Sequence, residues 1–356
     1  MNGKLTRVVA EGNTIWFTDH RYAALFFYNL NEKKCELYTY LRDVQLLQVD
    51  ELAAAAKYEN RIIIAPIRGD EIIVCDRATS QLRNYKIHRS VKDNGFCSAI
   101  VNNDYLWITP STEKYILCFD MKNETLEYID ITDNGEHKDN ENNIYGYAIN
   151  VGNSIWLPCL FDNAILEFDM NSKKLRKCPV ALEGAEVSVL SYCNGLFYIL
   201  NERNHKLIEW NQKGHLREIE FSPFQTELKL PIHKTVVIGD EILFLPREID
   251  DFWVYSAKED KWRKIADKPN SSSLYEEAVI IENKVYGFDL REGINFIWNH
   301  DTDEMAFFEI EFSNCAQRLL TDMNLAQRIQ NHMPVTYQES ECDYYVFIAA
   351  LSKLRN

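Results

Sequence analysis

The amino-acid sequence predicts an all-β protein: a seven-bladed β-propeller of four-stranded antiparallel blades, followed by a C-terminal α-helical appendage. Three observations support this prediction. Four apolar runs of strand length follow one another between Ser98 and Asp130, the same unit recurs seven times, and the recurrence stops after Glu311. A small sheet that can bury one face only by stacking on a copy of itself is typical of propellers.

The stretch between Ser98 and Asp130 shows the unit most clearly. Its apolar runs occupy residues 98–101, 106–109, 116–119 and 126–129. The turns Asn102-Asn103-Asp104 and Lys122-Asn123-Glu124 carry short polar side chains that bond their own backbone and tolerate left-handed geometry. These features predict a four-stranded antiparallel meander.

The second strand of each unit aligns by eye along the chain. Its seven copies are IWFTD at 15, IIIAP at 62, LWITP at 106, IWLPC at 155, LFYIL at 196, ILFLP at 242 and VYGFD at 285. From Trp16 to Tyr286 the chain covers 270 residues in six intervals, or 45 per repeat, which is the length of a propeller blade. We therefore expect seven blades closed into a ring.

The flanking segments complete each blade. An apolar run and a turn precede every second strand, and two further strands follow it. The turn between the third and fourth strands repeats an acidic residue or Asn and then a Lys-rich or Asn-rich tip, which we interpret as a solvated hairpin end that protects the strand edges. Because the first strand belongs to its own blade, closure is expected to rest on packing between blades one and seven, with a swapped strand as the open alternative.

Two domains follow from this pattern, with the propeller at residues 1–312 and the helical extension at 313–356. Asn314 to Gln317 resembles a capped helix start, and apolar residues at helical spacing follow until Pro334. Ser340 begins a second amphipathic candidate. These helices are expected to pack on the propeller or to dock a partner.

Composition narrows the classes of partner. The formal net charge is −15, so the whole-molecule field repels nucleic-acid phosphates and anionic lipid surfaces. No run of eighteen apolar residues occurs and the N-terminus lacks a signal-peptide pattern, which favours a cytoplasmic protein. The nine cysteines include no CxxC pair, so we expect buried reduced thiols. Trp16, Trp107 and Trp156 recur at one strand position and are predicted to form core between blades.

Two families of propeller are similar to parts of the chain. The segment VYSAKEDKWRKI, which contains Tyr255 and Trp262, resembles the kelch pattern of a Tyr, an acidic turn and a Trp on the outer strand. The cores IWFTD and LWITP resemble strands of streptogramin lyase-like propellers. The resemblance covers residues 5–312 and implies the fold. The kelch double glycine is missing and the catalytic His and Glu residues of the lyases have no counterpart, so no catalytic residue is carried over.

Basic residues recur in the loops that join second to third strands. Six of these seven loops carry one, in a protein that is otherwise acidic: Arg21, Arg68, Lys114, Arg203, Arg247 and Arg291. Placed around a ring, they are predicted to bind an acidic peptide or a small anionic ligand, because guanidinium groups suit carboxylates and phosphates. The alternative is that each pairs with a neighbouring loop acid such as Asp70 or Glu248.

A second cluster is expected where the first strands begin, at the channel entrance. Its members are Tyr145, Glu186, His233, Glu276 and Glu277. A His with carboxylates can bind a divalent cation or transfer protons, which makes Glu186, His233 and Glu277 candidate catalytic residues. No HExxH, GxGxxG, GxxxxGK[ST] or GxSxG motif accompanies them, and no resident cofactor is predicted.

The sequence thus favours a non-catalytic binding or scaffold propeller. A metal-dependent lyase or hydrolase with its site at the channel mouth is the alternative, and a divalent cation is possible under that alternative. A purely structural role with the C-terminal helices docking a partner is a third possibility. The fold alone does not choose among them.

Overall fold

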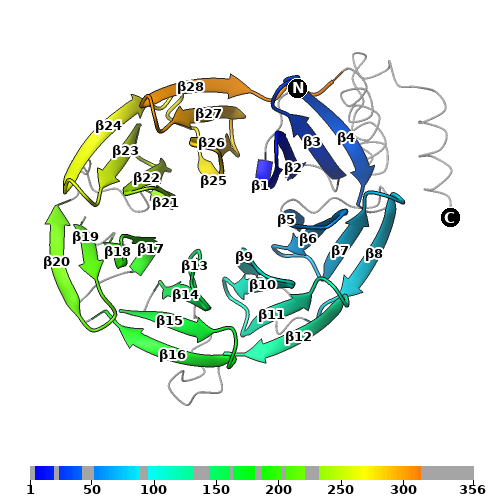
Figure 1. The fold of residues 1–356 in the computed structure, drawn as a ribbon, viewed down its shortest axis with the longest axis horizontal. Helices are drawn as coiled ribbons and strands as arrows, with labels where there is room; N and C mark the ends of the chain where they lie inside the picture. Colours follow the sequence, from blue (N-terminus) through cyan, green and yellow to red (C-terminus); the bar gives the residue numbers. More distant parts are fainter. Residues whose placement is uncertain are drawn as a thin grey trace, which may run out of the picture.

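Seven four-stranded antiparallel sheets form a closed ring in the computed structural model (Figure 1). The structure describes residues 5–19, 24–41, 52–88, 95–131, 144–160, 163–180, 187–201, 206–220 and 232–313. Within them each blade uses four consecutive strands in sequence order, so the predicted seven-bladed propeller is confirmed. The predicted helices at 314–356 lie outside the described residues.

The strands follow the repeat closely. Blade one contains β1 (Leu5–Glu11), β2 (Thr14–Asp19), β3 (Ala24–Asn29) and β4 (Lys34–Tyr40). Blade two contains β5 (Leu52–Tyr58), β6 (Arg61–Pro66), β7 (Glu71–Asp76) and β8 (Gln81–Lys86). Blade three contains β9 (Phe96–Asn102), β10 (Tyr105–Pro110), β11 (Tyr115–Asp120) and β12 (Thr125–Asp130). Blade four contains β13 (Ile149–Val151), β14 (Ser154–Cys159), β15 (Ala164–Asp169) and β16 (Lys174–Pro179).

The last three blades repeat the arrangement. Blade five contains β17 (Val187–Cys193), β18 (Leu196–Asn201), β19 (Lys206–Trp210) and β20 (His215–Glu220). Blade six contains β21 (Ile232–Ile238), β22 (Glu241–Pro246), β23 (Asp251–Ser256) and β24 (Lys261–Asp267). Blade seven contains β25 (Tyr275–Ile281), β26 (Lys284–Asp289), β27 (Ile294–Asn299) and β28 (Glu304–Glu309). The first strand of each blade borders the central channel and the fourth forms the outer edge (Figure 1).

The core lies between neighbouring blades. Trp107 of blade three contacts Phe168 of blade four with ring centroids 5.4 Å apart, and Trp156 contacts Phe197 of blade five at 4.6 Å. Trp16 packs in one cluster with Ile62 of blade two. These contacts confirm that the recurring tryptophans are core between blades.

The repeated Asp or Asn at the turn between third and fourth strands has a structural role. In blade three the Asp120 carboxylate accepts hydrogen bonds from the backbone N–H groups of Lys122 and Asn123, both at 2.9 Å. These bonds, that from Asn123 foremost, lower the pKa of Asp120. The turn is completed by Glu124 at φ 55°, a left-handed conformation. The acidic residue therefore stabilises the backbone conformation of the turn in addition to placing a solvated charge there.

Blades one and seven close the ring without a swapped strand, because β1 pairs with β2 inside its own sheet. Phe26 of β3 contacts Phe312 at 5.0 Å, and Tyr28 contacts Phe308 of β28 at 6.2 Å. Beyond β28, Phe312 forms an isolated parallel bridge with Cys35 of β4. Closure thus rests on packing between blades one and seven, with this short bridge added.

The two faces of the ring carry different connections. In every blade, the turns between the first and second strands and between the third and fourth strands lie on one face, the hairpin face. The loop face carries the connections from second to third strand and from blade to blade. Seven described cysteines are free, and six of them are buried. Among the described residues there is no helix long and apolar enough to span a membrane.

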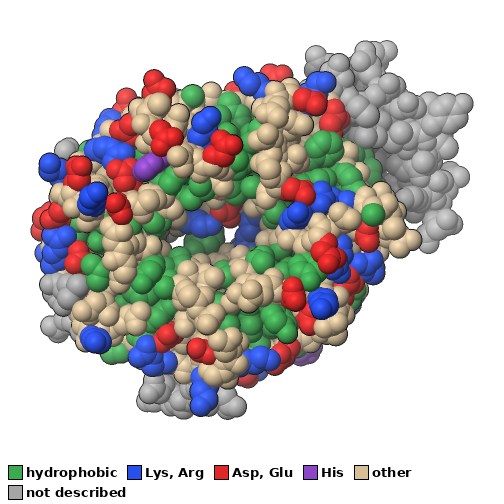
Figure 2. Space-filling view, viewed as in Figure 1, with side chains coloured by type: hydrophobic (Ala, Val, Ile, Leu, Met, Phe, Trp, Pro, Cys, Tyr) green, Lys and Arg blue, Asp and Glu red, His purple; other side chains and the backbone are tan. Residues whose placement is uncertain are grey.

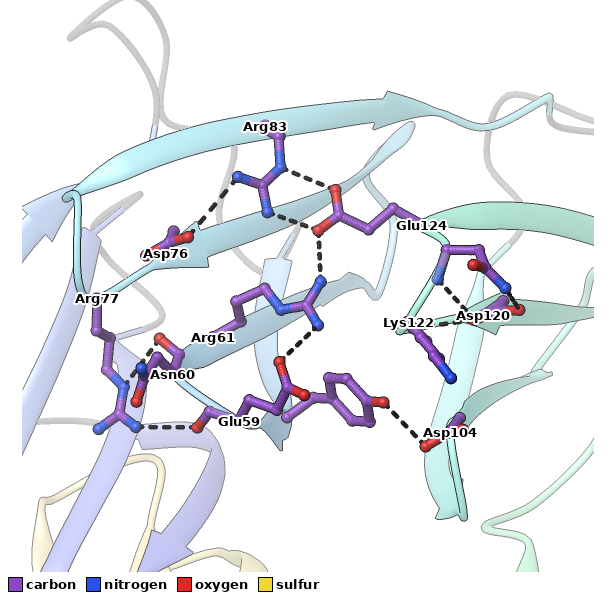
Figure 3. A network of polar contacts seen from close by, with 12 residues as sticks. Glu59, Asn60, Arg61, Asp76, Arg77, Arg83, Asp104, Asp120, Lys122 and Glu124 are labelled. Atoms are coloured by element: carbon purple, nitrogen blue, oxygen red, sulfur yellow. Dashed lines mark hydrogen bonds and ion pairs between the residues drawn. The ribbon is translucent and has the colours of Figure 1, made fainter.

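A network of polar contacts joins blades two and three on the hairpin face (Figure 3). Glu124 of blade three accepts hydrogen bonds from Arg61 at 2.7 Å, from Arg83 at 2.8 Å and from the hydroxyl of Tyr85. The bonds from Arg83 foremost lower the pKa of Glu124 to about 2. This carboxylate links two strands of blade two to the outer hairpin of blade three.

Candidate binding site at the channel mouth

Five of the channel-lining strands carry a β-bulge at the same place, one residue after the strand begins at the loop face. The bulged residues are Thr6, Cys97, Ser188, His233 and Glu276. A bulge interrupts the alternation of side chains along a strand and re-aims the extra residue. Repeated around the ring, this irregularity brings polar residues to one end of the channel.

Two side chains cross part of the channel and reach past an intervening blade. Arg7 of blade one donates from Nη2 to the carbonyl of Cys97 in blade three. The intervening strand β5 contains Leu52 followed by four alanines, whose short side chains leave space for the guanidinium. Tyr147, just before β13, forms a 2.8 Å hydrogen bond between its hydroxyl and Nε2 of His233 in blade six.

Charges of both signs surround this hydrogen bond. Nζ of Lys234 lies 2.5 Å from Oε1 of Glu277 and 5.5 Å from the centre of the Tyr147 ring. Nε2 of His233 lies 3.9 Å from Oε1 of Glu276. Seen from the hairpin face, the hub of the ring is hollow and Lys and Arg side chains lie inside it (Figure 2).

His233 is held neutral in this setting. Burial, followed by the positive charges of Arg247 and Lys234, lowers the pKa of His233 to about 3. Burial, with Glu276 as the next contribution, raises the pKa of Tyr147 far above its usual value. The Tyr147–His233 contact is therefore a hydrogen bond between two uncharged side chains at neutral pH.

Arg7 is the most buried cation of the cluster, with 8% of its surface exposed. Its Nη1 atom is buried and has no hydrogen-bond partner among the residues that the structure describes. A buried N–H group without a partner costs about 1–3 kcal/mol. A hydrogen-bond acceptor bound beside Nη1 of Arg7 would therefore remove this free-energy cost.

The predicted basic residues occupy different positions in their loops. Arg21 and Arg203 lie outside the described residues. The five-residue segments 66–70, 110–114, 246–250 and 289–293 each consist of the last residue of a second strand and the loop that follows it. In these segments Arg247 is second, Arg68 and Arg291 are third and Lys114 is fifth. The structure therefore brings Arg247 to the cluster and spreads Arg68, Arg291 and Lys114 over the loop face.

Backbone hydrogen bonds show where these loop positions lie relative to the channel. The carbonyl of Ile67, in second position, accepts the N–H of Phe96 at the start of the next channel-lining strand, at 2.8 Å. The carbonyl of Lys114, in fifth position, accepts the N–H of Ile131, which follows the outermost strand β12, at 2.9 Å. A second-position residue thus lies beside the channel and a fifth-position residue at the rim.

Buried polar groups hold these loops in place. The Asp289 carboxylate accepts the backbone N–H groups of Leu274 at 2.9 Å and Arg291 at 3.0 Å. Nζ of Lys268 donates to the carbonyl of Arg247 at 3.1 Å, and burial lowers the pKa of Lys268. Arg247 and Arg291 therefore stand on ordered loops.

The structure describes only some members of the predicted catalytic cluster. Glu186 lies outside the described residues, Glu277 pairs with Lys234, and Tyr145 is buried and bridges to Cys159. Among the described residues, no three His, Cys, Asp or Glu side chains gather as a metal ion requires. His233 and Glu276 do lie together.

Sequence reasoning missed four members of the cluster: Arg7, Cys97, Tyr147 and Lys234. A usable signal was present, because several channel-lining strands open with one buried apolar residue and then polar ones, as in Leu-Thr-Arg, Phe-Cys-Ser and Ile-His-Lys. Aligning these openings would have placed Arg7 and Lys234 at the same level of the channel.

Comparison with known proteins supports the fold. No protein-family model matches the sequence, and no curated protein does so. Virginiamycin B lyase from Staphylococcus aureus, solved as a catalytically inactive variant with quinupristin, is similar with a TM-score of 0.63 and 11% identity over 81% of this chain and 92% of that one. The WD40 repeats of RRP9 give 0.59 and 8% over 80% and 87%.

A third structure, YCF48 bound to D1 peptide, gives a TM-score of 0.50 and 9% identity over 70% of this chain and 78% of that one. At these identities the likenesses show the propeller fold alone.

Proposed function

We propose that this protein is a non-catalytic binding propeller that recognises a carboxylate-bearing partner, an acidic peptide or a small anionic ligand, at the loop-face mouth of its channel. The observation that carries this proposal is the position of Arg247 on the loop that adjoins the neutral His233, with Lys234, whose ammonium pairs with Glu277, beside it in β21. Arg7 adds a buried guanidinium whose Nη1 has no hydrogen-bond partner within the described part of the chain.

The protonation states favour binding over proton transfer. An efficient general acid or base has a pKa near the working pH. The pKa of His233 is lowered to about 3 and that of Tyr147 is raised, so both move away from neutrality. An uncharged pair flanked by cations is suited to accepting a carboxylate without a change of protonation.

Calorimetric titration with succinate and with a hexaglutamate peptide tests this function. We expect at least one to bind, and R247Q to weaken that binding about tenfold through loss of a charge-assisted hydrogen bond. The matched control is R176Q. Arg176 lies on the outer strand β16, pairs with Glu167 and carries the same charge away from the channel. Failure of both probes to bind, or an equal loss in R176Q, would contradict the proposal.

The two probes also separate the two kinds of partner. Binding of hexaglutamate alone would identify a peptide partner that also uses the outer loop residues Arg68 and Arg291. Binding of succinate alone would identify a small ligand seated in the mouth. Either result upholds carboxylate recognition.

A metal-dependent lyase or hydrolase at the same mouth is the second candidate, and the 3.9 Å approach of Glu276 to His233 is the observation that favours it. Under this alternative, purified protein contains a stoichiometric divalent metal that H233A loses while retaining its fold. Elemental analysis of both proteins checks this. Equal metal content in the two proteins would reject His233 as a ligand.

A further inference from the structure

The guanidinium of Arg7 lies at the loop-face end of the channel, where a hydrogen bond fixes one side of it. Its Nη2 donates to the carbonyl of Cys97, and its Nη1 is buried without a hydrogen-bond partner in the described part of the chain. Arg7 acts electrostatically on two titratable side chains, Cys97 and Tyr147, and burial raises the pKa of each. Both are therefore uncharged at neutral pH, so neither supplies a negative charge to the guanidinium.

Between Arg7 and the hairpin face, the channel-lining strands carry apolar residues at one common level. Each residue of this level pairs with the third residue of the adjacent second strand, as Val9 pairs with Trp16. Six of the seven strands carry an apolar residue there, and we call these six the apolar collar: Val9, Ala56, Ile100, Ile149, Val236 and Val279. The seventh member of the level is Ser191. Four of the six collar residues are partly exposed.

The hairpin-face end of the channel also carries exposed apolar side chains. Val101 of β9 and Ile280 of β25 each follow a collar residue by one position, and each is 43% exposed. Their strands stand on opposite sides of the channel (Figure 1). Seen from this face, the hub is hollow and contains Lys and Arg side chains (Figure 2). A molecule that enters from the hairpin face therefore passes apolar side chains before it reaches the cations.

These dimensions suit a short chain. Arg7 and Ala10 are three residues apart in β1, which is about 10 Å along an extended strand at about 3.3 Å per residue. Each methylene group moved from water to an apolar surface strengthens binding by at most about fourfold. A second carboxylate on the same surface would lose its hydration without gaining a partner. The formal charge of −15 on the chain would also repel it.

We propose that the ligand is a monocarboxylate with an apolar chain. It enters from the hairpin face, places its chain along the apolar collar and binds Nη1 of Arg7 through its carboxylate. This inference rests on the proposed function and names its ligand class. A carboxylate oxygen at Nη1 accepts a charge-assisted hydrogen bond and removes the cost of the buried donor. The charge at one end of the ligand and the apolar chain at the other match the two ends of the channel.

Titration calorimetry with the straight-chain monocarboxylates from acetate to decanoate tests the chain. We expect the affinity to rise by about two- to fourfold per added methylene group and to level off once the chain reaches the hairpin-face opening. Suberate has the carbon number of octanoate but a second carboxylate, and it should bind at least about tenfold more weakly than octanoate. Octanol should also bind at least about tenfold more weakly, because it forms no charge-assisted hydrogen bond with Arg7.

Variants assign the two ends of the ligand. R7Q should weaken octanoate binding about tenfold, with circular dichroism to check the fold, and the octanol comparison tests the same contact in the unaltered protein. The double variant V101S/I280S should weaken decanoate binding about three- to tenfold and leave acetate binding unchanged, because it alters only the apolar opening. The matched control is F307S. Phe307 is 37% exposed on the outer strand β28, so its loss should change neither affinity.

The outcomes separate the two proposals. Equal affinities for acetate and decanoate, or tighter binding of suberate than of octanoate, would overturn the apolar chain and leave carboxylate recognition standing. Octanol that binds as tightly as octanoate, or a folded R7Q that binds octanoate unchanged, would remove Arg7 from the site and so contradict the inference. If none of these carboxylates binds, and succinate and hexaglutamate do not bind either, both proposals are overturned.

Discussion

The hairpin-face network around Glu124 and the cluster around His233 at the channel mouth are both rich in charge, yet they are built differently. In the network, Arg61 and Arg83 converge on one carboxylate (Figure 3). Nearby, Arg77 bonds Glu11 at 2.6 Å. At the mouth, Arg7 bonds a backbone carbonyl and His233 is neutral.

This difference indicates different roles. Guanidinium groups matched to carboxylates across a blade boundary hold the blades in register, and a ligand can add little to them. Nη1 of Arg7 has no hydrogen-bond partner among the described residues, and a bound anion would offset the desolvation cost of such a buried cation. The comparison therefore indicates a structural role for the hairpin-face network and agrees with the recognition role that we propose for the channel mouth.

The largest expected effect comes from acid. The pKa of His233 is lowered from 6.5 to about 3, so the unfolded state binds a proton at this residue before the folded state does. Stability is therefore lost as pH falls from about 6.5 towards 3, by about 2–3 kcal/mol between pH 6 and pH 4. Urea unfolding at both pH values should show this loss in the wild type and a correspondingly smaller loss in H233Q. An equal acid dependence in both proteins would show that His233 is not held neutral.

The next effect tests the network. Replacing Glu124 by Gln removes the charge that Arg61 and Arg83 share, and the free energy of unfolding at pH 7 should fall by about 2 kcal/mol. Urea unfolding measures the change. E127Q is the matched control, because Glu127 has Lys173 as its ion-pair partner and is half exposed, so its loss should cost less than about 1 kcal/mol.

The same variant has a pH signature. The pKa of Glu124 is lowered from 4.5 to about 2, so its contribution to stability is complete above about pH 4.5 and is lost as pH falls towards 2. The stability gap between wild type and E124Q should therefore close on acidification. A gap that stays constant down to pH 2.5 would mean that the charge of Glu124 is not what stabilises the blade boundary.

The smallest effects sharpen the comparison within the loop face. R247Q should weaken succinate binding about tenfold, R68Q and R291Q about two- to threefold, and K114Q by less than twofold, because the charge moves outward from the channel and solvent screens it. Parallel titrations give the order. An equal loss in all four variants would indicate a diffuse field rather than a site at the mouth.

The sequence predicted the propeller because its signals are local. Turn residues such as Asn103 and Asp120 mark hairpins, and strand cores such as that around Trp107 repeat at a regular interval. The binding cluster depends on other information. Arg7 and Cys97 are 90 positions apart, and Tyr147 and His233 are 86 apart, and each pair meets only because a long side chain crosses the channel.

The β-bulges could not be predicted from the sequence either. His233 and Glu276 were identified from their strand ends, but the extra residue that re-aims them leaves no separate mark in the alternation of apolar and polar residues. Equivalent loop positions for Arg247, Arg68 and Lys114 could not be read either, since the second, third and fifth residues of a five-residue segment look alike without the backbone bonds that place them.

A crystal structure of the protein soaked with succinate would locate the proposed anion site. We expect a succinate carboxylate at the loop-face end of the channel, within hydrogen-bond distance of the Arg247 guanidinium and beside His233. Succinate bound at the hairpin face beside Arg61, Arg77 or Arg83, with the channel mouth unchanged, would contradict it.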